Sequence, residues 1–184
     1  MKELIKRNLN GKKVLLLFIA TNIVYVFMLT VTIPAVMQHS GGLKILDMMP
    51  LGYDAAYVNT LFDTLGTTGR EIYLFKQLPV DLLYPFLFGV SSCLVLAYFL
   101  NKLGKEDKPV FYLCFIPLFS GLFDYAENIG IISLLNQYPE HTAGMVTITS
   151  IFSVLKSSFT TLYFIILIIA LIAYAKNRVF RKTA

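Results

Sequence analysis

Residues 118–135 read LFSGLFDYAENIGIISLL, an apolar stretch of eighteen residues with the length of a membrane-spanning helix. Asp124 and Glu127 lie in its middle, about one helical turn apart. An ionised side chain at the centre of a bilayer costs at least about 2.5 to 3.5 kcal/mol on insertion scales, so such groups turn toward other helices and find partners there. The stretch therefore predicts a helix bundle with a polar site buried inside it.

The composition of the whole chain is that of an integral membrane protein. Hydrophobic residues make up 57% of the 184 residues, charged residues make up 15%, and the mean hydropathy is +0.68. These values exceed what a water-facing globule requires. We expect an all-α, polytopic integral membrane protein in which residues 1–184 form one domain, a four-transmembrane-helix bundle. The four predicted spans are residues 14–36, 79–100, 110–135 and 145–175.

Basic residues gather at the predicted membrane edges. If the spans alternate in direction, twelve of the sixteen lysines and arginines flank them on the side that holds both termini. These twelve are Lys2, Lys6, Arg7, Lys12, Lys13, Lys102, Lys105, Lys108, Lys176, Arg178, Arg181 and Lys182. Only Lys44, Arg70 and Lys76 flank the spans on the opposite side. The positive-inside rule then predicts a multi-pass protein of the cell membrane with cytoplasmic N- and C-termini.

The net charge of +5 is explained by these membrane-edge clusters. Anionic lipid headgroups attract such clusters, so we expect membrane lipids as partners. No basic and aromatic surface is left over for nucleic acid, and we expect no nucleic-acid partner.

Residues 37–78 form the one long connection, which this topology places on the non-cytoplasmic side. Asp54 can cap a helix that reaches to about Leu65, because apolar residues recur there at helical spacing. Gly66 and Gly69 would end that helix, and Pro79 suits the first turn of the second span. We therefore expect a partly helical outer segment whose apolar face docks over the mouth of the bundle.

Polar side chains recur along one face of the third predicted span, and the fourth span supplies a cation. The residues on the third span are Ser120, Asp124, Glu127 and Asn128. Lys156 lies on the fourth span, with Ser153 along the same face. Because one cation fully compensates one carboxylate, we expect Lys156 to pair with one of the two acids and to leave the other more readily protonated. The sequence leaves open which acid is paired.

Three further candidate residues lie at or before the start of the second span. Asp81 lies near the positive end of the helix dipole, Arg70 is the nearest further cation, and Tyr84 can hydrogen-bond within the site. Pro85 frees a backbone carbonyl that a polar neighbour must satisfy. Counting about 1.5 Å per residue from the helix ends places Asp81 and the acids of the third span in the outer half of the membrane. We expect a site that faces the outer solvent.

Several kinds of chemistry lack their sequence signals. His39 and His141 both lie in predicted loops, whereas a heme bundle needs axial ligands inside its helices. Cys93 and Cys114 have neither the C-x-x-C spacing of a redox site nor the spacing of a zinc site. No nucleophile motif such as G-x-S-x-G occurs. We therefore expect no metal and no cofactor.

The function that this pattern favours is binding or transport of a small polar or amphiphilic solute, or of protons, because acidic side chains inside membranes commonly mark such pathways. Four spans are few for a full translocation path, so we also expect a homo-oligomer. Two alternatives stay open. A membrane-embedded enzyme would apply carboxylate acid/base chemistry to a lipid-like substrate in an open pocket. A structural or regulatory partner protein would instead keep the acids dry and fully paired.

Cysteine labelling tests the predicted topology. We expect single cysteines introduced near Lys105 and near the C-terminus to react only from the cytoplasmic side, and cysteines within residues 40–77 to react only from outside. The reason is the division of flanking basic residues, twelve against three. Reversed labelling at any of the three places contradicts the four-span topology.

Overall fold

The computed structural model describes residues 2–183, with side chains through Val179. Helices make up 84% of the chain, and residues 2–183 contain no strand, which confirms the all-helical class. Four helices are long and apolar enough to span a membrane: Gly11–Met37, Ala55–Lys102, Pro109–Gln137 and Ala143–Val179. Each contains one predicted span and extends beyond it. Two residues of the predicted basic cluster, Arg181 and Lys182, lie outside the part whose side chains are described.

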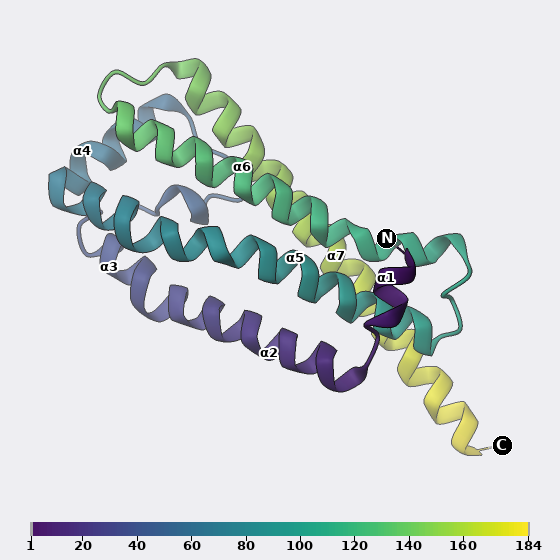
Figure 1. Ribbon diagram of the computed structural model, residues 1–184. Coiled ribbons are helices and arrows are strands. Elements are labelled where there is room, and N and C mark those ends of the chain that lie inside the picture. Colours follow the sequence, from purple (N-terminus) through teal and green to yellow (C-terminus); the bar gives the residue numbers. More distant parts are fainter. Residues whose placement is uncertain (1, 184) are drawn as a thin grey trace.

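The helices form an elongated bundle with both termini at one end (Figure 1). In chain order the elements are α1 (Lys2–Arg7), α2 (Gly11–Phe27), η1 (Met28–Thr32), α3 (Ile33–Met37), η2 (Leu46–Met48), α4 (Ala55–Ile72), η3 (Tyr73–Gln77), α5 (Leu78–Lys102), η4 (Pro109–Phe115), α6 (Ile116–Gln137) and α7 (Ala143–Thr183). The α5–η4 loop lies at the end that holds the termini, and α3, α4 and the α6–α7 turn lie at the opposite end (Figure 1). The predicted basic clusters that the structure describes therefore gather at one end.

Packing runs in the order α2, α5, α6, α7, with α5 and α6 in the middle. The backbones of α5 and α6 approach closely where glycine allows it. A Cβ atom on Gly121 would lie 2.7 Å from the carbonyl oxygen of Pro85, and one on Gly89 would lie 3.4 Å from the carbonyl oxygen of Pro117. This crossing brings the start of α5 against the polar face of α6.

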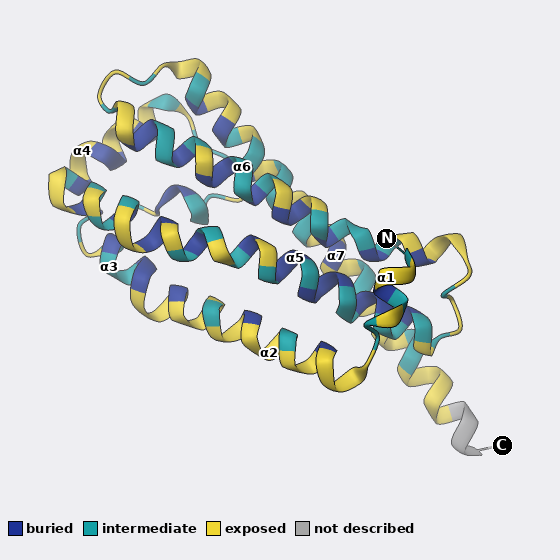
Figure 2. Ribbon diagram, in the orientation of Figure 1, coloured by how far each residue is buried: buried dark blue, intermediate teal, exposed yellow. Residues whose placement is uncertain are grey.

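The outer faces of the long helices are apolar and exposed (Figure 2). On α2 the exposed large side chains include Leu15, Leu16, Phe18, Ile19 and Ile23. On α7 they include Ile151, Ile165, Ile168, Ile169 and Ile172. A contiguous exposed apolar surface of this extent is not expected of a protein surrounded by water. It is consistent with a multi-pass membrane protein.

Three of the four long helices change their backbone geometry just before a proline. The π-helical turns η1 and η3 precede Pro34 and Pro79, and the 3-10 turn η4 precedes Pro117. Proline lacks an N–H group, and its ring clashes with the carbonyl four residues earlier in a regular α-helix. A widened or tightened turn accommodates the ring without ending the helix.

The second long helix begins earlier than the sequence predicted. Asp54 caps α4 with its side chain, and Gly66 (φ 60) interrupts α4, both as predicted. Gly69 does not end the helix; it lies where a Cβ atom would come 2.8 Å from the Cβ atom of His39. The helix resumes after Gly66 and continues through η3 into α5. Pro79 lies in the first turn of α5, as the sequence predicted, but a π-helical turn joins α5 to the helix before it.

Candidate functional site

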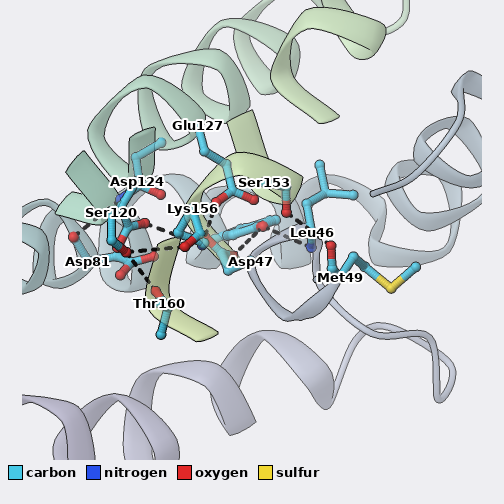
Figure 3. A network of polar contacts seen from close by, with 12 residues as sticks. Leu46, Asp47, Met49, Asp81, Ser120, Asp124, Glu127, Ser153, Lys156 and Thr160 are labelled. Atoms are coloured by element: carbon cyan, nitrogen blue, oxygen red, sulfur yellow. Dashed lines mark hydrogen bonds and ion pairs between the residues drawn. The ribbon is translucent and has the colours of Figure 1, made fainter. Parts of the chain in front are cut away.

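Lys156 of α7 lies between the two acids of α6 (Figure 3). Its Nζ atom is 3.3 Å from Oδ1 of Asp124 and in direct contact with Oε2 of Glu127. The Glu127 side chain is fully buried, and the Asp124 side chain is 8% exposed. The prediction that Lys156 pairs with only one acid is therefore wrong. An ammonium group has three donors, and two acids one turn apart on one helix face are within its reach.

The contact between α6 and α7 is set by the turn that joins them. Asp124 precedes the last residue of α6, Gln137, by thirteen residues, and Lys156 follows the first residue of α7, Ala143, by thirteen residues. Both groups thus lie at the same depth, about 20 Å from the turn. Ser120 strengthens the contact, because its hydroxyl donates to the Lys156 carbonyl over 3.2 Å and lies 2.6 Å from the hydroxyl of Thr160.

Asp81 enters the cluster from the first turn of α5. Pro85 lies four residues later and has no N–H group, so the Asp81 carbonyl lacks its usual helical partner. The side-chain amide of Asn128 donates to this carbonyl over 3.2 Å. The prediction that a polar neighbour satisfies the carbonyl freed by Pro85 is confirmed, and Asn128 is that neighbour.

Asp47 also belongs to the cluster, and sequence reasoning missed it. The hydroxyl of Tyr73 donates to Oδ2 of Asp47 over 2.5 Å, and the backbone N–H of Leu46 donates to the same hydroxyl over 3.2 Å. Asp47 and Asp81 line the same cavity, which is described below. The available signal was that Asp47 stands alone within an apolar run, ILDMM, in a segment predicted to be a connection.

Two serines of α7 hold the segment that carries Asp47. Ser153 donates to the Met49 carbonyl over 3.0 Å, and the Tyr53 N–H donates to Ser150 over 2.8 Å. Gly52 (φ 86) lies so close that a Cβ atom would come 2.6 Å from Oγ of Ser150. The predicted site residue Ser153 thus positions the Asp47 segment. The outer segment does border the cluster, but through residues 47–50, while α4 packs on α3, η3 and α7.

Arg70, another predicted site residue, does not join the cluster. Its Nη1 atom donates to the Phe62 carbonyl over 2.6 Å, and its guanidinium group lies 4.6 Å from the ring centre of Tyr138. The change of direction at Gly66 turns the Arg70 side chain back toward the part of α4 that precedes Gly66. Among the side chains described through Val179, Lys156 is therefore the only cation that makes an ion pair within the cluster, and it pairs with Asp124 and Glu127.

A cavity of about 420 Å³ reaches this cluster from the side of the bundle. The polar side chains along it are those of Asp47, Gln77, Asp81, Ser120, Asp124, Lys156, Ser157, Thr160 and Thr161. The apolar and aromatic ones include Tyr25, Met28, Leu29, Ile33, Tyr84 and Phe88. Tyr25 and Leu29 are 41% and 42% exposed, and Thr161 is exposed as well. The cavity thus opens between α2 and α7, which pack on α5 and α6 instead of on each other.

Several buried polar atoms at the cluster have no hydrogen-bond partner. They are Oδ1 of Asp47, the Tyr53 hydroxyl, Nε2 of Gln77, Oε1 of Glu127 and Oδ1 of Asn128. Leaving such an atom unsatisfied costs about 1–3 kcal/mol. Burial, with the nearby Glu127 and Asp47 carboxylates, raises the pKa of the Tyr53 phenol, which keeps this hydroxyl a donor at neutral pH. The unpartnered atoms mark the cluster as suited to a ligand with both donors and acceptors.

Fold and site together define an all-helical protein with four helices long and apolar enough to span a membrane, arranged around a buried carboxylate and lysine cluster. Comparisons with protein-family models, with curated proteins and with solved structures give no match. Within residues 2–183 no three histidine, cysteine, aspartate or glutamate side chains are arranged to hold a metal ion.

Removal of Lys156 tests the role of the ion pairs. We expect Lys156→Met to lower the free energy of unfolding by about 3 to 5 kcal/mol, because it leaves two buried carboxylates without a cation. Asp124→Asn and Glu127→Gln added together should restore most of the loss, and Lys176→Met, at an exposed position of α7, should change little. Thermal unfolding in detergent measures all four proteins. Equal melting of Lys156→Met and the unmodified chain contradicts the assigned pairing.

Proposed function

We propose that this protein binds, and carries, a small amphiphilic solute inside the membrane. The observation that supports the proposal is the cavity of about 420 Å³ that has charged side chains at its inner end and apolar and aromatic side chains along its walls. Ligand sites are typically cavities of about this size, lined by apolar groups with a few placed polar ones. Such a lining fits a molecule with one polar head and one apolar part.

The proposal places the four long helices across the cell membrane with both termini in the cytoplasm. The exposed apolar faces of α2 and α7 support insertion, and the basic residues at the end that holds the termini support the orientation. On α7 the exposed large apolar side chains are densest between Ile148 and Ile172. Lys156 lies about 12 Å from the first and about 24 Å from the second, which favours the outer half of the bilayer.

Access to the cavity follows from its position. Its opening lies between α2 and α7, whose neighbouring surfaces are apolar and exposed. A solute dissolved in the bilayer can enter sideways. Its head group then reaches Asp81, and its apolar part lies along Met28 and Leu29. A water-soluble solute would first have to cross the apolar surface around the opening. This argues for an amphiphile dissolved in the membrane.

A purely structural role accounts poorly for the same observations. Ion pairs that only fix helix register are expected to be dry and fully paired. Here Asp47, Asp81 and Asp124 line an open cavity, and Asp47 and Asp81 have no ion pair among the described side chains. The expectation of a homo-oligomer stays a prediction, since the structure describes a single chain.

Photolabelling with a matched pair of variants tests the proposal. Ser157 lines the cavity, whereas the next residue, Ser158, is exposed on another face of α7. We expect an alkanol or an alkylammonium ion that carries a diazirine in its chain to label Tyr25, Met28 or Tyr84 in the full chain in nanodiscs. Ser157→Trp should lower this labelling because the indole fills the cavity, and Ser158→Trp should leave it unchanged.

Peptide mass spectrometry locates the labelled residues. The proposed function is overturned if, for both probes, labelling spreads evenly over exposed positions such as Leu16 and Ile165 and Ser157→Trp does not lower it.

A further inference from the structure

We infer that the solute carries an organic ammonium head group, held between the Asp47–Asp81 carboxyl pair and the aromatic wall of the cavity. This inference rests on the proposed function and specifies the chemistry of its ligand. It is carried by the distribution of charge, by the unpartnered carboxyl oxygen of Asp47, and by the aromatic side chains that line the cavity with Asp47 and Asp81.

The charge balance leaves two carboxyl groups for a ligand. Lys156 is engaged by Asp124 at 3.3 Å and by direct contact with Glu127. Asp47 and Asp81 have no ion pair in the part of the chain whose side chains are described, and both line the cavity. A positively charged head group placed there is attracted by the carboxyl groups of Asp47 and Asp81. Lys156 repels it little, because two acids already compensate the charge of Lys156.

Asp47 and Asp81 offer carboxylate oxygens to a cation in the cavity. Tyr73 donates to Oδ2 of Asp47, whereas Oδ1 of Asp47 is buried and has no hydrogen-bond partner among the described residues. Because a carboxylate oxygen only accepts, this atom suits a positively charged head group.

The wall of the cavity next to the pair is aromatic. The rings of Tyr25 and Tyr84 stack with their centres 5.4 Å apart, and the ring of Phe88 lies 5.8 Å from that of Tyr84. All three line the cavity beside Asp81. Aromatic faces attract ammonium groups, most strongly where water is excluded. An inorganic cation would instead require several oxygen ligands around it, and an apolar wall supplies none.

The other titratable groups around the pair are few and come from every element that packs there. They are Tyr25 of α2, Tyr53 beyond η2, Tyr73 of η3, Tyr84 of α5, Asp124 and Glu127 of α6, and Lys156 of α7. The acids of α6 are held by Lys156. Gln77 is fully buried and lines the cavity; its Oε1 atom accepts from Thr32, and only its Nε2 atom has no partner. Asp47 and Asp81 are thus the carboxyl groups left for a cation.

Calorimetry on the full chain in nanodiscs tests the inference with hexyltrimethylammonium as the probe and hexanol as its neutral counterpart. We expect hexyltrimethylammonium to bind about tenfold or more tightly than hexanol, because only the cation gains the charge and ring contacts.

Two variants and a matched control assign cation binding to the two carboxyl groups. Asp47→Asn and Asp81→Asn should each weaken cation binding about tenfold or more. Asp54→Asn also removes one carboxylate from the same part of the chain, but Asp54 is exposed, and asparagine caps a helix as well. It should bind like the unmodified chain. Unfolding curves confirm that the variants are folded.

The outcomes separate the two proposals. If hexanol binds as tightly as hexyltrimethylammonium, and Asp47→Asn and Asp81→Asn change neither, the ammonium inference is wrong and the proposed binding function stands. Displacement of the probe by equimolar Na⁺ or Ca²⁺ also overturns the ammonium inference. If neither probe binds, both proposals fail.

Discussion

The placement of Lys156 between Asp124 and Glu127 is the contact on which the rest of the site depends. Three charged groups lie among helices whose outer faces are apolar, where a charge is tolerated only with a partner. The contact joins α6 to α7 at the depth that the turn between them sets. Because it engages both acids of α6 with a single cation, it leaves the carboxyl groups of Asp47 and Asp81 free to face the cavity.

The backbone of α5 and α6 brings those carboxyl groups within reach of the ion pairs. Gly121 allows α6 to approach Pro85, and the same proline frees the Asp81 carbonyl that Asn128 satisfies. A larger residue at 121 would push the start of α5, and Asp81 with it, away from Asp124. The proline that weakens the helix and the glycine that permits contact thus act together in shaping the cluster.

Much of the architecture follows from local sequence. Stretches of apolar residues predict the four long helices, and the spacing of Asp124, Glu127 and Asn128 places them on one face of α6. Both features depend on residues close together in the chain. Lys156 was also predictable as the partner of these acids, because a cation inside an apolar span needs an anionic partner.

Other features depend on contacts between distant segments, which periodicity does not reveal. Asp47 joins the cluster only because serines of α7 hold its segment, and Arg70 leaves it only because the chain turns at Gly66. The continuation of the second long helix upstream of Pro79 was missed for a local reason. A proline read as a helix start can equally follow a π-helical turn, and the sequence alone does not distinguish these two backbones.

Solid-state NMR of the protein with ¹⁵N-labelled lysine and with ¹³C-labelled carboxyl groups in aspartate and glutamate tests the central claim most directly, namely that Lys156 holds both acids of α6. The account predicts dipolar coupling from Nζ of Lys156 to the carboxyl carbons of Asp124 and of Glu127. Both couplings should be lost in Lys156→Met and kept in Lys176→Met. Coupling to only one of the two acids, or to neither, would contradict the account.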